Sequence, residues 1–273
     1  MRTGGAPVLL LLLVMAAAGL DAAEHPALAK ARALHNAADF DGAIAAAAIA
    51  RADPASADAA ALVGARSYLE RYRLRTGDPA DLTAAREALG KVQSQALSPR
   101  DQMDLLLGLG QALYLANTFG AAAELFDIAW RRAMSLSALS DRERSMLLDW
   151  WANAVDREAQ TLDADRRGAL LRPVMQRMDD ELRDDPGNAT ANYWLAVAAR
   201  GSGDVERAWH AAVAAWVRAP LQPVTAATLR GNIDRFVTTV LIPERSRARP
   251  PREQQAALLD FQTQWERVKQ QWP

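Results

Sequence analysis

Apolar side chains recur along the chain at the spacing of an α-helix. The last stripe shows this most clearly, because Leu258, Phe261, Trp265, Val268 and Trp272 follow one another at intervals of three or four residues. That spacing places apolar side chains on one face of a helix, whereas a half-buried strand alternates apolar and polar residues. No segment sustains such alternation, so the pattern predicts an all-α protein.

Polar residues, glycine and proline divide the chain into stretches of helical length. Ser140 and Glu143 have the spacing of a capping box, in which side chains satisfy free backbone N–H groups at a helix start. Pro173 lies inside one stretch and predicts a kink or a late helix start there, and 237–242 is the only run with a β-like composition. The predicted helices cover 26–37, 39–52, 57–75, 79–97, 99–116, 119–135, 140–161, 163–184, 188–201, 204–218, 223–241 and 252–271.

Two of the predicted hairpins share one pattern of small and large apolar residues. In each, the first helix carries leucine beside a small residue, Gly110 or Ala196, and the second helix carries small residues at intervals of three or four. The positions are Leu106, Leu109, Gly110, Leu113, Ala122, Phe126 and Ala129 in the first hairpin, and Leu195, Ala196, Ala199, Ala208, Ala212, Ala215 and Pro220 in the second. Both follow the spacing W-x2-L-G-x2-Y…A-x3-F…P, so 100–135 and 187–220 resemble tetratricopeptide repeats.

The resemblance implies a right-handed α–α superhelix of about six helical hairpins, closed by a C-terminal capping helix. Segment 26–54 repeats the pattern in part, while 57–97 and 140–186 have the length of a hairpin without the motif. A general α–α solenoid without tetratricopeptide ancestry is the alternative.

Small residues are expected where the two helices of a hairpin come close. Gly110 should face Ala122, and Ala196 should face Ala208, because the absence of bulk lets helices pack near the lower end of the ~8–10 Å range of interaxial distances. The residues assigned to repeat packing are Gly110, Ala122, Phe126, Ala129, Leu195, Ala196, Ala208 and Ala215.

The resemblance also implies a binding surface. In tetratricopeptide proteins the first helix of each hairpin lines a concave groove that holds a segment of another protein. The residues of this chain at those positions are Asp104, Leu107, Gln111, Tyr114, Thr190, Tyr193, Val197 and Arg200. They lack the lysine and asparagine set with which the family clamps a C-terminal carboxylate. Their mixture of aromatic, apolar and polar groups favours an extended segment of modest polarity.

The composition favours packing over chemistry. Of 273 residues, 50% are hydrophobic but only 6% are aromatic, and the excess is mostly alanine, which is the best helix former. A net charge of −1 offers no basic surface for nucleic acid, and the absence of cysteine removes disulfides and thiolate sites. The histidines, His25, His35 and His210, do not have metal-ligand spacing. We therefore expect no catalytic residue, metal or cofactor.

The N-terminal segment 1–22 is typical of a cleavable signal peptide. Arg2 precedes the apolar run Val8–Met15, and small residues follow it. A periplasmic or secreted bacterial protein without a lipid-bearing cysteine is expected, and an uncleaved anchor is the alternative. The remainder divides into a helical repeat domain over 23–242, an arginine- and proline-rich linker over 243–251, and the capping helix over 252–273.

Three further features allow both a functional and a structural interpretation. The acidic run 179–185 either binds a cation or a basic partner, or forms a solvated face of a helix. The arginines of the linker either contact anionic lipid or an acidic protein, or simply face solvent. They are Arg245, Arg247, Arg249 and Arg252. All eight tryptophans follow residue 129, and Trp209 and Trp216 share a helix face, where they bind a partner or fill space between hairpins.

These observations lead to a functional hypothesis. The chain is expected to be a non-catalytic adaptor or scaffold that binds a segment of an unidentified protein in its groove. The alternative is an enzyme or small-ligand carrier that uses the tryptophan-rich C-terminal half as a pocket, with convergent polar groups and shifted pKa values. Assembly of identical chains through the last helix is a third possibility.

Overall fold

A computed structural model of the chain describes residues 24–136, 139–221 and 226–273. Throughout these ranges the secondary structure is helical, without a strand. The expected signal segment 1–22 lies outside them. The α-helices are α1 (Pro26–Asn36), α2 (Phe40–Ala50), α3 (Ala57–Arg71), α4 (Pro79–Leu89), α5 (Pro99–Leu115), α6 (Phe119–Leu136), α7 (Asp141–Ala159), α8 (Ala164–Asp184), α9 (Ala189–Gly201), α10 (Val205–Arg218), α11 (Ala226–Phe236), α12 (Ile242–Arg247) and α13 (Gln254–Gln271). Short 3₁₀ or π segments are η1 (Tyr72–Thr76), η2 (Ser94–Ala96), η3 (Ala219–Leu221), η4 (Val237–Leu241) and η5 (Pro251–Glu253).

Side-chain caps begin many of these helices where the sequence predicts them. At the start of α7 the Ser140 side chain accepts from the Glu143 backbone N–H, and the Glu143 side chain accepts from the Ser140 backbone N–H. Asp78 and Ser98 cap α4 and α5 directly before a proline, whose missing N–H costs nothing in the first turn. The caps explain why the predicted starts agree with the observed ones.

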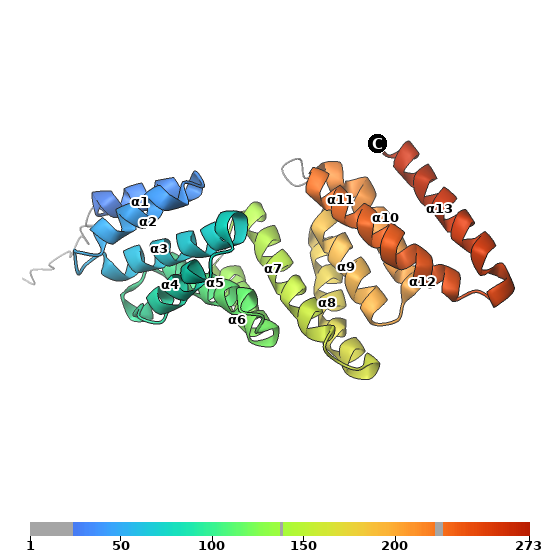
Figure 1. Ribbon diagram of the computed structural model, residues 1–273, viewed down its shortest axis with the longest axis horizontal. Coiled ribbons are helices and arrows are strands. Elements are labelled where there is room, and N and C mark those ends of the chain that lie inside the picture. The colour runs from blue at the N-terminus through green and yellow to red at the C-terminus, as the bar shows by residue number, and fades with distance from the viewer. Residues whose placement is uncertain (1–23, 137–138, 222–225) are drawn as a thin grey trace, which may run out of the picture.

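Helices that follow one another pack as neighbouring pairs, as the short turns predict. Figure 1 shows α1 at one end of the molecule and α13 at the other, with the helices between them arranged along its long axis. Alternate helices also touch: α7 contacts α5 on one side and α9 on the other. The helices α5, α7 and α9 therefore lie next to one another, and this arrangement positions the site described below.

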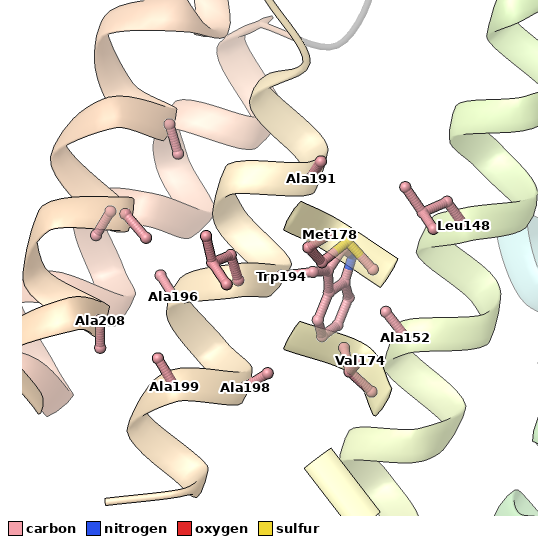
Figure 2. Packing of buried hydrophobic residues seen from close by; sticks show 14 of the residues in the cluster. Leu148, Ala152, Val174, Met178, Ala191, Trp194, Ala196, Ala198, Ala199 and Ala208 are labelled. Carbon is pink, nitrogen blue, oxygen red and sulfur yellow. The ribbon is translucent and has the colours of Figure 1, made fainter. Parts of the chain in front are cut away.

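The core consists of three clusters of buried apolar residues, of which the largest reaches from Leu107 on α5 to Trp265 on α13. Figure 2 shows Trp194 of α9 directed toward α7, with Met178 and Val174 of α8 close to its ring. Alanine contributes much of the rest of the cluster, because methyl groups allow close helix packing. The residues predicted to pack the repeats are all buried: Gly110, Ala122, Phe126, Ala129, Leu195, Ala196, Ala208 and Ala215.

The side of Gly110 that carries no side chain is covered by a large residue. The side chain that meets Gly110 is the ring of Phe126, one turn further along α6. Phe126 is fully buried, and the bare Gly110 backbone provides the space that its ring occupies. The small residue at this position therefore accommodates a large side chain of the partner helix.

The predicted boundaries differ from the structure in two places. The helix expected over 79–97 ends at Leu89 with Gly90 as its C-terminal cap, and only a 3₁₀ turn, η2, follows before residue 97. The linker expected over 243–251 is helical in its first half, where α12 continues from η4. Ile242 at the start of α12 is buried in the core, and its packing holds this segment against the other helices.

Two local ambiguities are settled by packing. Pro173 lies inside α8, which runs through it without a late start. Leu171 and Val174 on either side of it are buried, so their packing offsets the one backbone hydrogen bond that proline removes. The β-like run 237–242 forms a π-helical turn, η4, followed by the start of α12.

The C-terminal helix α13 covers the end of the helical array. Its Trp265 is fully buried against Trp209 and Trp216 of α10, with ring centroids 6.1 and 5.3 Å away. The Trp265 Nε1 donates a 2.7 Å hydrogen bond to Asp234 Oδ1 of α11. Trp265 thus packs onto α10 and hydrogen-bonds to α11, whereas Trp272 at the end of the predicted stripe is 52% exposed.

Candidate functional site

A hollow of about 450 Å³ opens between α5, α7, α9 and the segment formed by α11 and η4. These elements are far apart in the sequence and are brought together because α7 packs between α5 and α9. The lining residues are Tyr114, Asn153, Asp156, Arg157, Gln160, Tyr193, Trp194, Val197, Arg200, Phe236 and Val240. Rings and aliphatic groups alternate with polar groups in this set, as in sites that bind organic ligands or side chains.

Tyr114 forms the α5 side of the hollow. Its hydroxyl donates a 2.9 Å hydrogen bond to Asn153 Oδ1 of α7, and its ring meets the edge of Trp150 at 5.1 Å between centroids. Phe119, at the start of α6, contacts the Tyr114 ring from another direction, with the ring centroids 5.2 Å apart. These contacts hold Tyr114 in one orientation.

Tyr193 and its aromatic neighbours form the opposite side. The Tyr193 ring meets Trp194 at 5.2 Å and Phe236 at 6.2 Å, both nearly edge to face. Trp194 is buried, and its Nε1 donates a 2.8 Å hydrogen bond to Asp149 Oδ1 of α7. The indole thereby joins α9 to α7 beneath the hollow.

Two carboxyl groups of α7 lie near these rings: Asp149 accepts from Trp194 Nε1 and lies outside the lining, and Asp156 lines the hollow. The surrounding protein raises the pKa of Asp149 although the residue keeps contact with solvent, and the Trp194 N–H partly opposes that shift. Burial raises the pKa of Asp156 against the effect of a 2.7 Å hydrogen bond from Gln160. Burial, together with these two carboxyl groups, raises the pKa of Tyr193 to about 12. Asp156 and Tyr193 both line the hollow and both have a raised pKa, and such groups are more frequent at functional sites than elsewhere.

Two arginines line the hollow, and both are already engaged. Arg200 Nε lies 3.0 and 3.1 Å from the carboxylate oxygens of Glu244 on α12, and this pairing raises the pKa of Arg200. The guanidinium of Arg157 stacks over the ring of Phe119 at 5.4 Å. Arg200 is therefore paired with a carboxylate, whereas Arg157 contacts a ring and is exposed to solvent.

Four of the residues predicted for the groove belong to this hollow, namely Tyr114, Tyr193, Val197 and Arg200. They come from α5 and α9, and α7 between these helices completes the surface. Thr190 is half-buried at the start of α9 and lies outside the lining.

The other three predicted groove residues do not lie on an open surface. Asp104, Leu107 and Gln111 are only 5, 8 and 8% exposed. Asp104 forms an ion pair with Arg66 of α3 at 2.8 Å, and Leu107 belongs to the largest core cluster. At this end of the molecule, contact between α3 and α5 closes the surface that the repeat pattern alone leaves open.

Sequence reasoning missed the contribution of α7 to the hollow. Its unit, 140–186, lacks the repeat motif, so no groove position could be assigned to it. A signal was nevertheless present, because four polar residues recur at helical spacing and share one face: Asn153, Asp156, Arg157 and Gln160.

The arginines expected to lie in a free linker include one that is firmly packed. The Arg245 guanidinium lies between Trp209 at 4.6 Å and Phe261 at 4.2 Å, and its Nε forms a 2.8 Å hydrogen bond with Glu206. Arg247 reaches its own helix at Pro243 O, and Arg252 contacts the adjacent glutamate. Arg245 therefore fastens α13 to α10.

The acidic run 179–185 is largely paired with arginine. Asp179 contacts Arg207 of α10, and the buried Glu181 contacts Arg144 of α7 at 2.9 Å. No group of three or more potential metal ligands occurs in the part of the chain that the structure describes. These ion pairs join neighbouring helices and account for the charges of Asp179 and Glu181.

A smaller hollow of about 180 Å³ lies beside Trp130, between the end of α6 and the start of α7. Residues 137–138, which connect those helices, are outside the described ranges. The larger hollow has described residues on all of its lining elements, so it is the candidate site.

None of the helices within the described ranges is long and apolar enough to cross a membrane. Comparisons with known protein families, with curated proteins and with solved structures find no match for this chain.

Proposed function

We propose that the protein is a non-catalytic binding protein of the tetratricopeptide type, and that its hollow holds a segment of another protein. The observation that carries the proposal is the convergence of Tyr114, from one predicted repeat, with Tyr193, Val197 and Arg200 from another. The repeat spacing alone predicts a common binding surface for these residues.

The construction of the hollow supports this function. It is lined by α5, α7, α9 and α11, which alternate with helices packed behind them. Its volume, about 450 Å³, suits a few side chains of an extended segment. Aromatic walls with a few polar groups provide both contact area and orientation.

A small-ligand carrier is the second candidate, because the raised pKa values of Asp149 and Asp156 also suit a polar small molecule. The two residues are seven positions apart on α7, which places their Cα atoms about 10 Å apart along the helix. That separation does not form the close carboxyl pair in which two acids share one proton.

Selection of peptides on the intact protein tests the proposal. Peptides displayed on phage are selected on the full chain and then measured against Val197→Arg, which fills the hollow. His210→Arg, on the exposed side of α10, is the matched control because it adds the same side chain elsewhere. Selected peptides should bind the His210 variant as well as the wild type and lose binding to the Val197 variant. Equal binding to both variants would contradict the proposal.

We also propose export of the protein, on the basis of segment 1–22. Fractionation of the source cells, combined with N-terminal sequencing of the recovered chain, tests this. Recovery in the cytoplasm with Met1 retained would contradict it.

A further inference from the structure

Arg157 on α7 differs from the other arginine that lines the hollow. Arg200 lies against both carboxylate oxygens of Glu244, with its Nε 3.1 and 3.0 Å from them. Arg157 is exposed, and its guanidinium lies over the ring of Phe119 at 5.4 Å. Within the ranges that the structure describes, no carboxylate pairs with Arg157. Its N–H groups can therefore take an acceptor from outside the protein while the guanidinium keeps its contact with the ring.

The acidic residues next to Arg157 in the sequence have other partners. Asp156 accepts a 2.7 Å hydrogen bond from Gln160. Glu158 accepts a 2.9 Å hydrogen bond from the backbone N–H of Gly120 at the start of α6. Asp156 is the single acid of the lining, which contains two arginines. The charges of the lining therefore do not exclude a carboxylate from a partner.

Asn153 provides a second donor on the same face of α7. It precedes Arg157 by four residues, and this spacing places the two side chains next to each other on one side of a helix. Asn153 Oδ1 accepts from the hydroxyl of Tyr114 at 2.9 Å, which leaves the two N–H groups of the Asn153 amide for another acceptor. The Tyr114 ring also contacts Phe119, the ring that lies against Arg157. The donors of Asn153 and Arg157 thus lie on the side of α7 that faces α5 and α6.

Asp156 belongs to a different face of α7. Asp149 precedes it by seven residues, or two helical turns, so these two side chains share a face. Asp149 accepts from Trp194 of α9, and this face is therefore directed toward α9. A carboxylate that binds Arg157 would approach from the α6 side of α7, away from the Asp156 carboxylate.

We infer that the protein segment held in the hollow presents an aspartate or glutamate side chain, whose carboxylate accepts from the Arg157 guanidinium and the Asn153 amide. A guanidinium binds a carboxylate through short, charge-assisted hydrogen bonds, often two in parallel. The inference rests on the proposed function and specifies the chemistry of the partner. Tyr114, which also lines the hollow, provides a ring surface for the aliphatic part of such a side chain.

Titration of the isotope-labelled full chain with short capped peptides tests the inference. The probes are N-acetyl-Ala-Glu-Ala-amide and N-acetyl-Ala-Gln-Ala-amide, which differ in charge and have nearly the same shape. Binding is followed by NMR through the side-chain amide resonances of Asn153, assigned from their absence in Asn153→Asp. The glutamate peptide should shift these resonances in a saturable manner, and the glutamine peptide should bind at least about tenfold more weakly.

Variants of two exposed arginines on α7 locate the anion. Arg157→Gln removes the guanidinium and should weaken the glutamate peptide by about tenfold or more, with little effect on the glutamine peptide. Arg157→Lys keeps the charge and should retain part of the affinity. Arg142→Gln removes the same charge fifteen residues earlier on the helix, about 22 Å away along its axis, and should leave the affinity within about twofold.

The outcomes separate this inference from the proposed function. Equal binding of the glutamate and glutamine peptides, or no shift of the Asn153 resonances with either, would overturn the acidic side chain and leave the proposed function to its own test. The acidic side chain is also overturned if phage selection returns peptides that need an open Val197 site but carry no aspartate or glutamate. If no peptide depends on the hollow, both proposals fail together.

Discussion

The ring of Phe126 on α6 lies directly against the backbone of Gly110 on α5. A Cβ atom added to Gly110 would come within 2.6 Å of Phe126 Cε1, much closer than carbon atoms approach in proteins. Phe126 is fully buried and also contacts Trp150 at 5.8 Å between ring centroids. One missing side chain therefore determines how α5, α6 and α7 pack beside the hollow.

The variant Gly110→Ala should be destabilised, because the Phe126 ring cannot move away without disturbing the core around it. Overpacking of this kind costs ~1–3 kcal/mol, which outweighs the helix propensity gained by alanine. Denaturant unfolding followed by circular dichroism measures the effect. Gly168→Ala in α8 is the matched control, since a Cβ there meets nothing within 4 Å, and it should be neutral or stabilising. A loss of stability in the control equal to that of Gly110→Ala would contradict the role of Phe126.

Substitution of Arg245 should loosen the C-terminal helix. Arg245→Gln removes a guanidinium that lies between Trp209 and Phe261, and we expect a loss of ~1–3 kcal/mol in the free energy of unfolding. Arg247→Gln changes an exposed arginine of the same helix and should change stability by less than ~0.5 kcal/mol. Equal stability of the two variants would mean that the stacked arrangement is not formed in solution.

Stability should decline on acidification through His35. Burial, with a smaller contribution from Arg66, lowers the pKa of His35 from 6.5 to about 4. Between these values the unfolded chain binds a proton that the folded chain does not, so the contribution of His35 to stability falls as the pH decreases from 6.5 to about 4. His35→Gln should show a smaller difference between its free energies of unfolding near pH 7 and about pH 5. An unchanged difference would contradict this assignment.

The opposite sign is expected for Asp156. Its raised pKa means that the folded state holds the proton more tightly than the unfolded chain, so the contribution of Asp156 to stability decreases as the pH rises above its ordinary value of 3.8. Asp156→Asn removes this penalty, and its melting temperature at neutral pH should equal or exceed that of the wild type. A lower melting temperature would indicate that the charge of Asp156 supports the fold.

Local sequence signals predicted the helices well, since their physical causes are local. Ser140 and Glu143 cap α7 as their spacing predicts, and the prolines after Asp78 and Ser98 begin α4 and α5. The prediction was wrong at Gly90, where a helix ends, and over 242–247, where one continues. Over 242–247 the helix continues because Ile242 is buried in the core, and the burial of a residue depends on the whole fold.

Half of the residues predicted for the groove line the hollow. Tyr114, Tyr193, Val197 and Arg200 lie in the hollow, and Asp104, Leu107 and Gln111 are covered by packing with other helices. Repeat spacing identifies the face of a helix on which a residue lies, but it does not state whether another helix covers that face. The α7 residues were missed because that unit carries no recognisable motif.

The sequence by itself determined that the chain is helical, where most helices begin, and which small residues are buried between paired helices. Those properties follow from hydrogen bonding within a few residues and from apolar periodicity. Only the tertiary structure decided that Phe126 fills the space beside Gly110, that Arg245 is stacked between two rings, and that the Trp194 indole of α9 donates to Asp149 of α7. The physical reason is that each of these relationships joins side chains from different helices, whose approach depends on the packing of the entire array.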